Sequence, residues 1–305
     1  MTKEQYLKNL EVPSGMIDVV LDTDTYNEID DQFAISYMLR SKEKLNCVAL
    51  YAAPFKNEKA DSPEEGMLRS YDEIKKVLAL CGEERLNDVV FKGSTCYLPD
   101  EKSPVDSEAV RDLCERAMKY SPEKPLYVVA IGAITNIASA LLTSPEIAEN
   151  IVIVWLGGNA HHKPNTMEFN MTQDYAAARV VMGSAAPFVQ LPCWGVVTEF
   201  RVSRADLEAW VIGHGKLGDY LANHTIEEAE SYAAGTPWTR VVWDVTAVAW
   251  LLNDGEKFMH TEVRPVRLPG YDHKYESAPI DKSPVYVDEI YRDALATDLF
   301  AKVTG

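Results

Sequence analysis

Four aspartates near the N-terminus have the residue type and spacing of a cation-binding site. Asp22 and Asp24 are separated by one residue, and Asp30 and Asp31 follow six residues after Asp24. Four carboxylates this close in sequence repel one another unless a cation or substrate hydroxyl groups lie between them. Ligation by oxygen alone favours a hard cation, Ca²⁺ or Mg²⁺, over zinc. The alternative is an acidic helix start with solvated neighbours, which accounts for one aspartate and leaves three unexplained.

The elements around these aspartates are predicted to be a strand followed by a helix. Residues 15–22 form a short, mostly apolar run that is typical of a strand. From Asp31 onward, the apolar residues are spaced as in a buried helix. The carboxylates therefore lie in the turn between the carboxyl end of a strand and the start of a helix. In an open α/β sheet, ligands bind in the crevice outside the carboxyl ends of the strands.

Apolar segments continue to alternate with amphipathic ones as far as Pro192. Continuous apolar strands separated by helices are typical of a parallel sheet that is covered on both faces. We expect further strands at residues 45–52, 88–93, 126–131, 151–156 and 188–191, with helices at 67–81, 107–120, 136–143 and 175–182.

Beyond Pro192 the alternation stops and helices dominate. The pattern predicts helices at residues 204–212, 217–232, 241–252 and 287–302, with a β-like segment at 262–268. The chain has no Ser/Gly linker, internal repeat or low-complexity tract. We therefore expect a single domain over residues 1–305: an open, mostly parallel, Rossmann-like α/β sheet with helices on both faces. A helical C-terminal region would pack at the end of the sheet that carries the site.

The composition argues against several classes of function. The 30 basic and 47 acidic residues give a formal net charge of −17, whereas nucleic acids and anionic membranes need a positive surface. The five cysteines are scattered, never spaced as CxxC, and typical of a reducing compartment. The N-terminus is polar without a signal-peptide core, and no apolar run is long enough to span a bilayer. We therefore expect a cytoplasmic protein.

Other residues that could complete the site are expected at the same edge of the sheet. Ile131 ends an apolar strand, and its carbonyl could ligate Ca²⁺, although a glycine turn at Gly132 is also ordinary. Glu168 and Asn170 lie in a later loop and could bind sugar hydroxyls, or could form an ordinary polar loop. Asp244 opens an apolar helix, where an aspartate is commonly a cap.

Taken in chain order, these segments resemble the motifs of the inosine–uridine-preferring nucleoside hydrolase family. The family carries an N-terminal Asp-x-Asp-Pro-Gly-x-Asp-Asp motif, a Gly-Pro-Leu-Thr-Asn turn, a Met-Gly-Gly strand end, a Glu-Phe-Asn loop and a late Asp. The matching segments in this chain are Asp22-Thr23-Asp24 with Asp30-Asp31, Gly132-Ala133-Ile134-Thr135-Asn136, Leu156-Gly157-Gly158, Glu168-Phe169-Asn170, and Asp244.

The resemblance implies a Ca²⁺-dependent hydrolase that cleaves the N-glycosidic bond of ribonucleosides to give free base and ribose. Asp24 would bind Ca²⁺ and act as the base for the attacking water. The other metal ligands would be Asp31, Asp244 and the carbonyl of Ile131. Asp22 would support the site without binding the metal. The family also implies a homodimer or homotetramer that functions in purine salvage.

The resemblance also implies a set of ribose contacts. Asp30, Glu168 and Asn170 would hold the ribose hydroxyls, with Asn57 as a further contact. The Asn that precedes Glu-Phe-Asn in the family corresponds to Asn165, with Asn159 as the alternative. Cleavage of an N-riboside passes through an oxocarbenium-like sugar, which carboxylates beneath the ring stabilise.

The departures from the family pattern fall where the base would bind. The loop between Asp24 and Asp30 is two residues longer, and a His-rich loop after the third strand is missing. The His that many members place before the last Asp is Trp243 in this chain, as in purine-specific members. The resemblance therefore implies a purine preference, with Trp243 assisting catalysis by stacking on the base. The second wall of the base pocket stays open among Tyr26, Phe55, Tyr97 and Trp238.

Several alternatives remain. Trp238 and Trp243 could be core residues and not a substrate platform. The chain could act on another or a modified N-riboside, or could bind Ca²⁺ and ribose without turnover. Phosphatases of the haloacid-dehalogenase type also carry Asp-x-Asp after a first strand, but the Glu168 loop would then have no role. The motifs GxSxG, GxGxxG and the P-loop are absent from the sequence.

Overall fold

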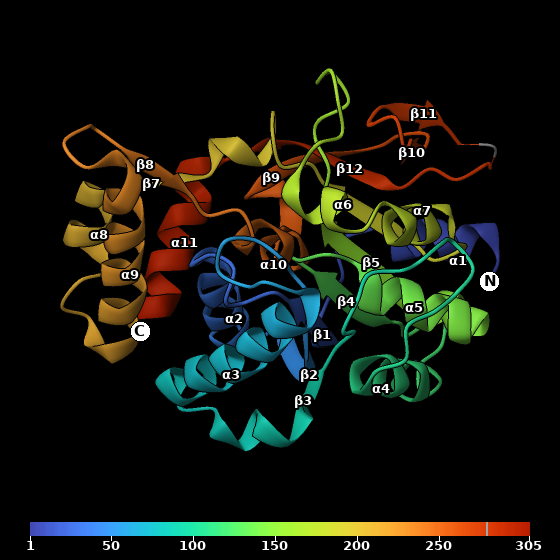
Figure 1. Cartoon of the computed structure of the whole chain (residues 1–305), viewed down its shortest axis with the longest axis horizontal. Helices are drawn as coiled ribbons and strands as arrows, with labels where there is room; N and C mark the ends of the chain where they lie inside the picture. Colours follow the sequence, from blue (N-terminus) through green and yellow to red (C-terminus); the bar gives the residue numbers. More distant parts are fainter. Residues whose placement is uncertain (279) are drawn as a thin grey trace.

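The computed structural model describes residues 1–278 and 280–305, and its centre is a mostly parallel sheet (Figure 1). In this part of the chain, eight strands form one sheet in the order β3-β2-β1-β4-β5-β6-β12-β9. Neighbouring strands run parallel except for β12 and β9, which pair antiparallel. The strands are β1 (Ile17–Thr23), β2 (Leu45–Ala52), β3 (Val90–Lys92), β4 (Leu126–Ala130), β5 (Ile151–Leu156), β6 (Phe188–Leu191), β9 (Met259–Val263) and β12 (Val285–Ile290).

Helices cover both faces of the sheet, which explains why its central strands are apolar throughout. Every residue of β4 and β5 is buried. Successive side chains enter opposite cores: Val19 and Leu21 lie in one cluster, and Val20 lies in the other. The first core is covered by α2 (Asp30–Leu39), α3 (Pro63–Cys81), α10 (Val245–Leu251) and α11 (Arg292–Thr304), and the second by α4 (Glu108–Ala117), α5 (Thr135–Thr143) and α7 (Tyr175–Gly183).

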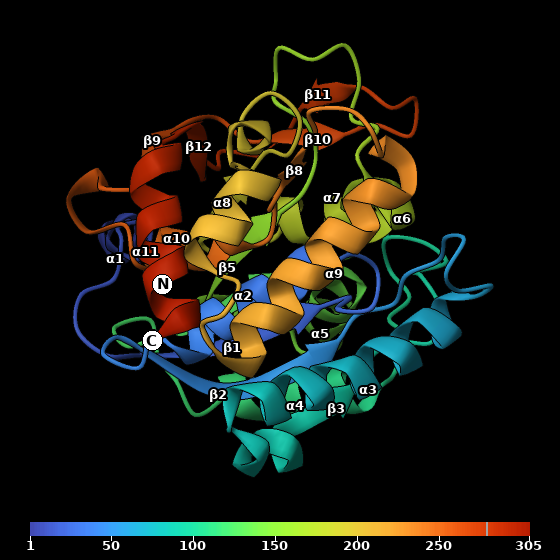
Figure 2. The same ribbon diagram turned by 90° about the vertical axis from the view of Figure 1, so that its left-hand side faces the viewer.

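A helical region lies beside α11 and α3 (Figure 2). It consists of α8 (Arg204–Trp210) and α9 (Gly215–Ala233). A short antiparallel pair, β7 (Arg201–Ser203) and β8 (Thr239–Val241), flanks the two helices and leads the chain into α10. This pair brings the segment around residue 240 back to the sheet, as expected for a C-terminal region packed at the site.

The remaining elements are short. They are α1 (Lys3–Asn9), α6 (Phe169–Gln173), the pair β10 (Arg267–Pro269) and β11 (Tyr275–Ser277), and the 3-10 helices Glu84–Val89, Pro145–Glu149, Val197–Glu199 and Asp254–Glu256. Within the described residues, no helix has the length and apolarity that crossing a membrane requires.

The predicted α/β class is confirmed, but the C-terminal third contains wrong assignments. The helix expected at 287–302 begins only at Arg292, because Val285–Ile290 form β12, which lies between β6 and β9. The helix expected at 241–252 begins at Val245, because Thr239–Val241 pair with β7. The β-like segment at 262–268 is divided between β9 and β10. That residues 1–305 form a single domain stays a prediction.

Candidate active site

The N-terminal aspartates lie at the carboxyl end of β1, where α2 begins. Asp24, Asp30 and Asp31 are each at most 2% exposed. The residue at the N-cap of α2 is Ile29, and no side chain caps this helix. The aspartates therefore do not serve as a helix cap, and the alternative of a solvated acidic helix start is wrong.

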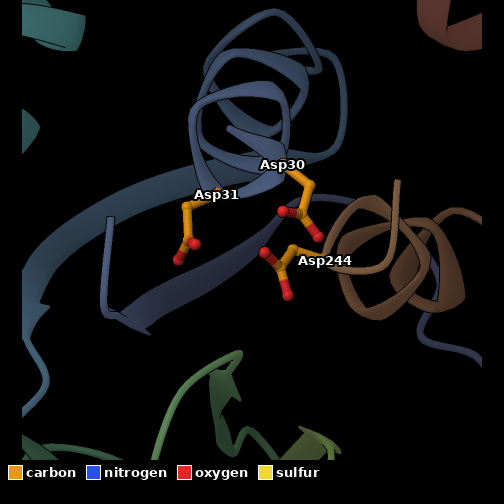
Figure 3. A group of neighbouring side chains, drawn as sticks. All are labelled: Asp30, Asp31 and Asp244. Atoms are coloured by element: carbon orange, nitrogen blue, oxygen red, sulfur yellow. The ribbon is translucent and has the colours of Figure 1, made fainter. Parts of the chain in front are cut away.

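Asp244 reaches the same point from the C-terminal half of the chain. It stands at the start of α10, and its carboxylate makes no capping hydrogen bond to that helix. Carboxyl oxygens of Asp30, Asp31 and Asp244 lie within 4.8 Å of one another, and Figure 3 shows Asp30 and Asp244 pointing toward each other. Asp24 is not a member of this group of three, although it lines the same pocket.

Several oxygens of the cluster are buried without a hydrogen-bond partner among the described residues. They include Oδ2 of Asp24 and Oδ1 of Asp30. The other oxygen of Asp30, Oδ2, accepts a hydrogen bond from the backbone N–H of Trp243 at 3.0 Å. Asp31 Oδ1 accepts a hydrogen bond from the Thr23 hydroxyl. Unpartnered buried carboxylate oxygens are costly, and a bound cation would satisfy them.

The electrostatics of the cluster also fit a cation. Burial raises the pKa of Asp24, Asp31 and Asp244 well above the usual range, and neighbouring carboxylates raise it further. Burial raises the pKa of Asp30 to about 7, with Glu28 adding to the rise and Arg240 opposing it. A divalent ion bound among these carboxyls would supply the missing positive charge and favour their ionised form. The donors are all oxygens, so the cluster suits Ca²⁺ or Mg²⁺.

Arg240 is a site residue that sequence reasoning missed. Its side chain is 12% exposed, and Nη2 lies 2.7 Å from Glu28, 3.5 Å from Glu228 and 3.8 Å from Asp30. Glu28 belongs to the lengthened loop between Asp24 and Asp30, so the insertion contributes to this ion-pair network. The guanidinium offsets part of the negative charge beside the aspartates.

Ile131, Asn170 and Glu168 meet at the carboxyl ends of β4 and β5. Asn170 Nδ2 donates to the carbonyl oxygens of Ile131 and Leu156, both at 3.0 Å. Glu168 caps α6, and its carboxylate accepts hydrogen bonds from the backbone N–H groups of Gly158, Asn170 and Met171. Burial raises the pKa of Glu168, and these three N–H groups oppose the rise.

Of the remaining predicted residues, Asn57 lines the pocket, whereas Asp22 and Asn165 do not. Asp22 does not line the pocket; it is buried behind it, and its Oδ2 accepts from Asn136 at 2.7 Å. Asn57 lines the pocket and donates to Asn27 of the lengthened loop at 2.7 Å. Asn165 is outside the pocket lining, because its side chain accepts from the N–H of Met167 within its own loop. The structure therefore does not bring Asn165 to the other residues predicted to bind ribose.

The carboxylates form one wall of a pocket whose volume is about 530 Å³. This volume is within the range of small-molecule sites, which runs from about 300 to 1,000 Å³. Of the predicted residues, the pocket is lined by Asp24, Asp30, Asp31, Asn57, Ile131, Glu168, Asn170, Trp243 and Asp244. The pocket thus joins one acidic wall to carbonyl and amide groups suited to sugar hydroxyls.

The aromatic part of the pocket differs from expectation. Tyr26, Phe55, Tyr97 and Trp238 do not line it. Phe55 is fully buried, and Trp238 packs against the core. Trp243 does line the pocket, together with Phe169, Trp194 and Tyr232. Trp194 follows the end of β6, so the rule that ligands bind beyond the carboxyl ends of strands could have singled it out.

Comparison with known proteins gives a family and several relatives. The chain matches the family described as inosine-uridine preferring nucleoside hydrolase over residues 19–282. It is 36% identical over 152 residues to the non-specific ribonucleoside hydrolase RihC of Salmonella paratyphi B. This alignment covers 47% of this chain and 45% of that protein. The match therefore spans less than half of the length of this curated relative.

Solved structures with the same fold cover nearly the whole chain. A plant nucleoside hydrolase superposes with a TM-score of 0.73 at 20% identity, covering 96% of this chain and 100% of that one. A purine-preferring ribonucleoside hydrolase from Gardnerella vaginalis superposes with a TM-score of 0.73 at 20% identity, covering 94% and 98% of the two chains. At such identities, the likeness shows the fold.

Proposed function

Because the chain belongs to the inosine-uridine preferring nucleoside hydrolase family, we propose that it hydrolyses the N-glycosidic bond of ribonucleosides to free base and ribose. The observation that carries the proposal is the buried group of Asp30, Asp31 and Asp244, with Asp24 in the same pocket wall. Their charges suit the oxocarbenium-like sugar that forms when such a bond breaks.

We propose Ca²⁺ as the metal, held by Asp24, Asp31, Asp244 and the carbonyl of Ile131. The all-oxygen donor set of these buried groups supports this choice. When bound, the ion would lower the pKa of a water and hold ribose hydroxyls against the carboxylates. Asp22 would support the cluster from behind through its hydrogen bond with Asn136.

Asp24 would act as the general base. Its Oδ2 has no partner among the described residues and would accept the proton of the attacking water. The water oxygen forms a bond with C1′ of the ribose, and the bond from C1′ to the base nitrogen breaks. The base leaves with that electron pair and takes up a proton from solvent.

The ribose would be held by Asp30, Asn57, Glu168 and Asn170. Glu168 is fixed by three backbone N–H groups and Asn170 by two carbonyls, so their positions are set before substrate arrives. Such preorganisation lowers the entropy cost of orienting the sugar.

The base would stack on Trp243, which favours a purine. Trp243 precedes Asp244 in the chain, its backbone N–H donates to Asp30, and it lines the same pocket as the residues proposed to bind ribose. A flat indole binds a purine ring at little entropy cost, and the contact would ease protonation of the leaving ring. We also propose a homodimer or homotetramer, which sedimentation of the purified chain would test.

The experiment is a ribose-release assay on inosine, adenosine, guanosine, uridine and cytidine, with Ca²⁺ and after chelation. Release from purine nucleosides that stops on chelation and returns with Ca²⁺ is the expected result. Release mainly from pyrimidine nucleosides would support the proposed hydrolase activity but contradict the purine preference. Absence of release from all five, with Ca²⁺ still bound, would reject ribonucleoside hydrolysis and point to a different riboside or to binding without turnover.

A further inference from the structure

The outer part of the pocket contains an exposed tryptophan that the mechanism does not use. Trp194 lines the pocket and is 51% exposed, although it is among the largest apolar side chains of the protein. Its ring centroid lies 5.5 Å from that of Trp243, with the two planes inclined by 58°. We propose that Trp194 determines base specificity by forming, with Trp243, an aromatic corner that binds the base.

The backbone that carries Trp194 is held in place by neighbouring segments. The carbonyl of Trp194 accepts the N–H of Ala160 at 2.9 Å, and the N–H of Cys193 donates to the carbonyl of Gly158 at 2.8 Å. Gly195 has a φ of +97°, a conformation that favours glycine. The indole is therefore exposed on a fixed turn, which is an arrangement suited to ligand binding.

The same turn is closely packed on its far side. A Cβ added to Gly195 would lie 2.8 Å from Lys163 Cε and 3.0 Å from both Ala160 Cβ and His162 Cε1. The turn cannot move toward the His161–Lys163 loop without displacing these atoms. The far side of the turn is thus occupied by side chains of Ala160, His162 and Lys163.

The geometry of the corner determines what it can bind. With ring centroids 5.5 Å apart and planes inclined by 58°, the two indoles form a tilted pair that leaves no room for a base to be inserted between them. A base would lie flat on one indole with its rim against the other. Trp243 adjoins Asp244 and so would contact the ring bonded to ribose, whereas Trp194 is the more exposed of the two and would contact the outer part of the base. A bicyclic purine reaches both indoles, and a single pyrimidine ring reaches chiefly Trp243.

This inference rests on the proposed function, and its test compares two substrates in one enzyme. We would measure kcat/KM for inosine and for uridine with the wild-type chain, Trp194→Ala, Trp194→Phe and Trp210→Ala. Trp210 is a matched control because it is also exposed, at 64%, and does not line the pocket. Thermal unfolding of each variant checks that the fold is retained.

Trp194→Ala should lower kcat/KM for inosine about tenfold or more, the size of a lost base–aromatic stack, with a much smaller loss for uridine. Most of the loss should be in KM, Trp194→Phe should retain most of the wild-type value, and Trp210→Ala should match the wild type. An unchanged ratio of inosine to uridine activity in a folded Trp194→Ala would overturn the inference.

Failure of the proposed function would be recognised separately. If the wild type releases no ribose from either nucleoside, binding of inosine is measured by equilibrium titration of the same four proteins. If Trp194→Ala alone binds inosine more weakly, the aromatic corner is supported although the proposed hydrolase activity is rejected. Equal binding by all four proteins, or no binding by the wild type, would overturn the corner as well.

Discussion

Gly132 leaves the space that the carboxylate of Asp24 occupies: a Cβ at position 132 would lie 2.8 Å from Asp24 Oδ1. The same atom would lie 3.2 Å from Ala53 Cβ, so a side chain at position 132 is confined on two sides. The φ of Gly132 is not in the left-handed region, so the glycine is needed for space and not for a special turn.

Replacement of Gly132 by alanine should therefore displace Asp24 and lower ribose release from inosine about tenfold or more, since misplacement of a catalytic group by about 1 Å costs up to about 10²-fold. The matched control is Gly183→Ala, because a Cβ at Gly183 meets nothing within 4 Å. Steady-state assays of both variants test this prediction, and equal activity of the two would contradict it.

Glu168 should contribute separately to stability and to activity. Glu168→Ala removes the cap of α6 and leaves three backbone N–H groups without their acceptor, so we expect a loss of about 1–3 kcal/mol in the free energy of unfolding. Glu168→Gln keeps one acceptor oxygen and should lose less stability. Both should lose most of the ribose-release activity, because neither supplies a carboxylate to the ribose.

Denaturant titration and the ribose assay measure the two quantities on the same samples. Wild-type activity in a stable Glu168→Gln would show that the carboxylate serves only as a cap. Equal loss of stability in the two variants would show that the cap does not depend on an acceptor oxygen.

Arg240 should stabilise the acidic side of the pocket. Arg240→Met leaves Glu28, Glu228 and Asp30 without their shared positive charge, and breaking a buried ion pair costs about 3–5 kcal/mol. We expect the melting temperature to fall by several degrees, and Glu28→Gln in the same chain to restore part of it. Arg204→Met is the control, because Arg204 is 51% exposed and pairs with exposed glutamates. Equal melting temperatures for the Arg240 and Arg204 variants would contradict this prediction.

Lys282 does not line the pocket, and it should make the stability of the protein depend on pH. It is buried, donates to the carbonyl of Ser184 at 2.9 Å, and makes no ion pair within residues 1–278 and 280–305. Burial lowers its pKa from 10.5 to about 7. Between these values the unfolded chain binds a proton that the folded chain does not, so the free energy of unfolding rises with pH.

Lys282→Met removes this titration. The variant should be more stable than the wild type at pH 7, and its advantage should shrink as the pH approaches 10. Melting temperatures measured across this range test the prediction, with the exposed Lys216→Met as control. A difference between Lys282→Met and wild type that does not change with pH would show that Lys282 is charged in the folded protein.

The parallel half of the fold could be predicted because its signals are local. β1, β4 and β5 are apolar runs bounded by polar turns, and each ends at a residue of the pocket or directly before one. β12 was missed because its burial comes from β6 and β9, which are distant in sequence, and no break in the pattern separates it from α11. β7 and β8 are only three residues long, which is too short for an alternation of apolar and polar residues to be recognised in the sequence.

The acidic wall of the site and Trp243 were predictable, whereas Trp194 and Arg240 were not. Asp24, Asp30 and Asp31 lie within eight residues of one another in sequence, so their closeness needs no tertiary information, whereas Asp244 joins them only through the fold. Trp194 reaches Trp243 only through the packing of the turn after β6, and Arg240 meets Glu28 only because β8 pairs with β7. Contacts between segments this far apart carry no periodic signal.

The central claim is that the buried aspartates catalyse hydrolysis, and Asp24→Asn tests it most directly. Asparagine keeps the size of the side chain but is a poor proton acceptor, so ribose release from inosine should fall about 10²- to 10⁴-fold, the contribution of a general base. Because one of several mutually repelling buried carboxylates is then gone, the melting temperature without Ca²⁺ should not fall.

The exposed Asp61→Asn serves as the matched control and should keep wild-type activity. The measurement is the initial rate of ribose release from inosine at saturating Ca²⁺, for the wild type and the two variants. A large loss confined to Asp24→Asn is the predicted result. Activity of a folded Asp24→Asn within about threefold of the wild type, well below the contribution of a general base, would contradict the assignment of Asp24 as the catalytic base.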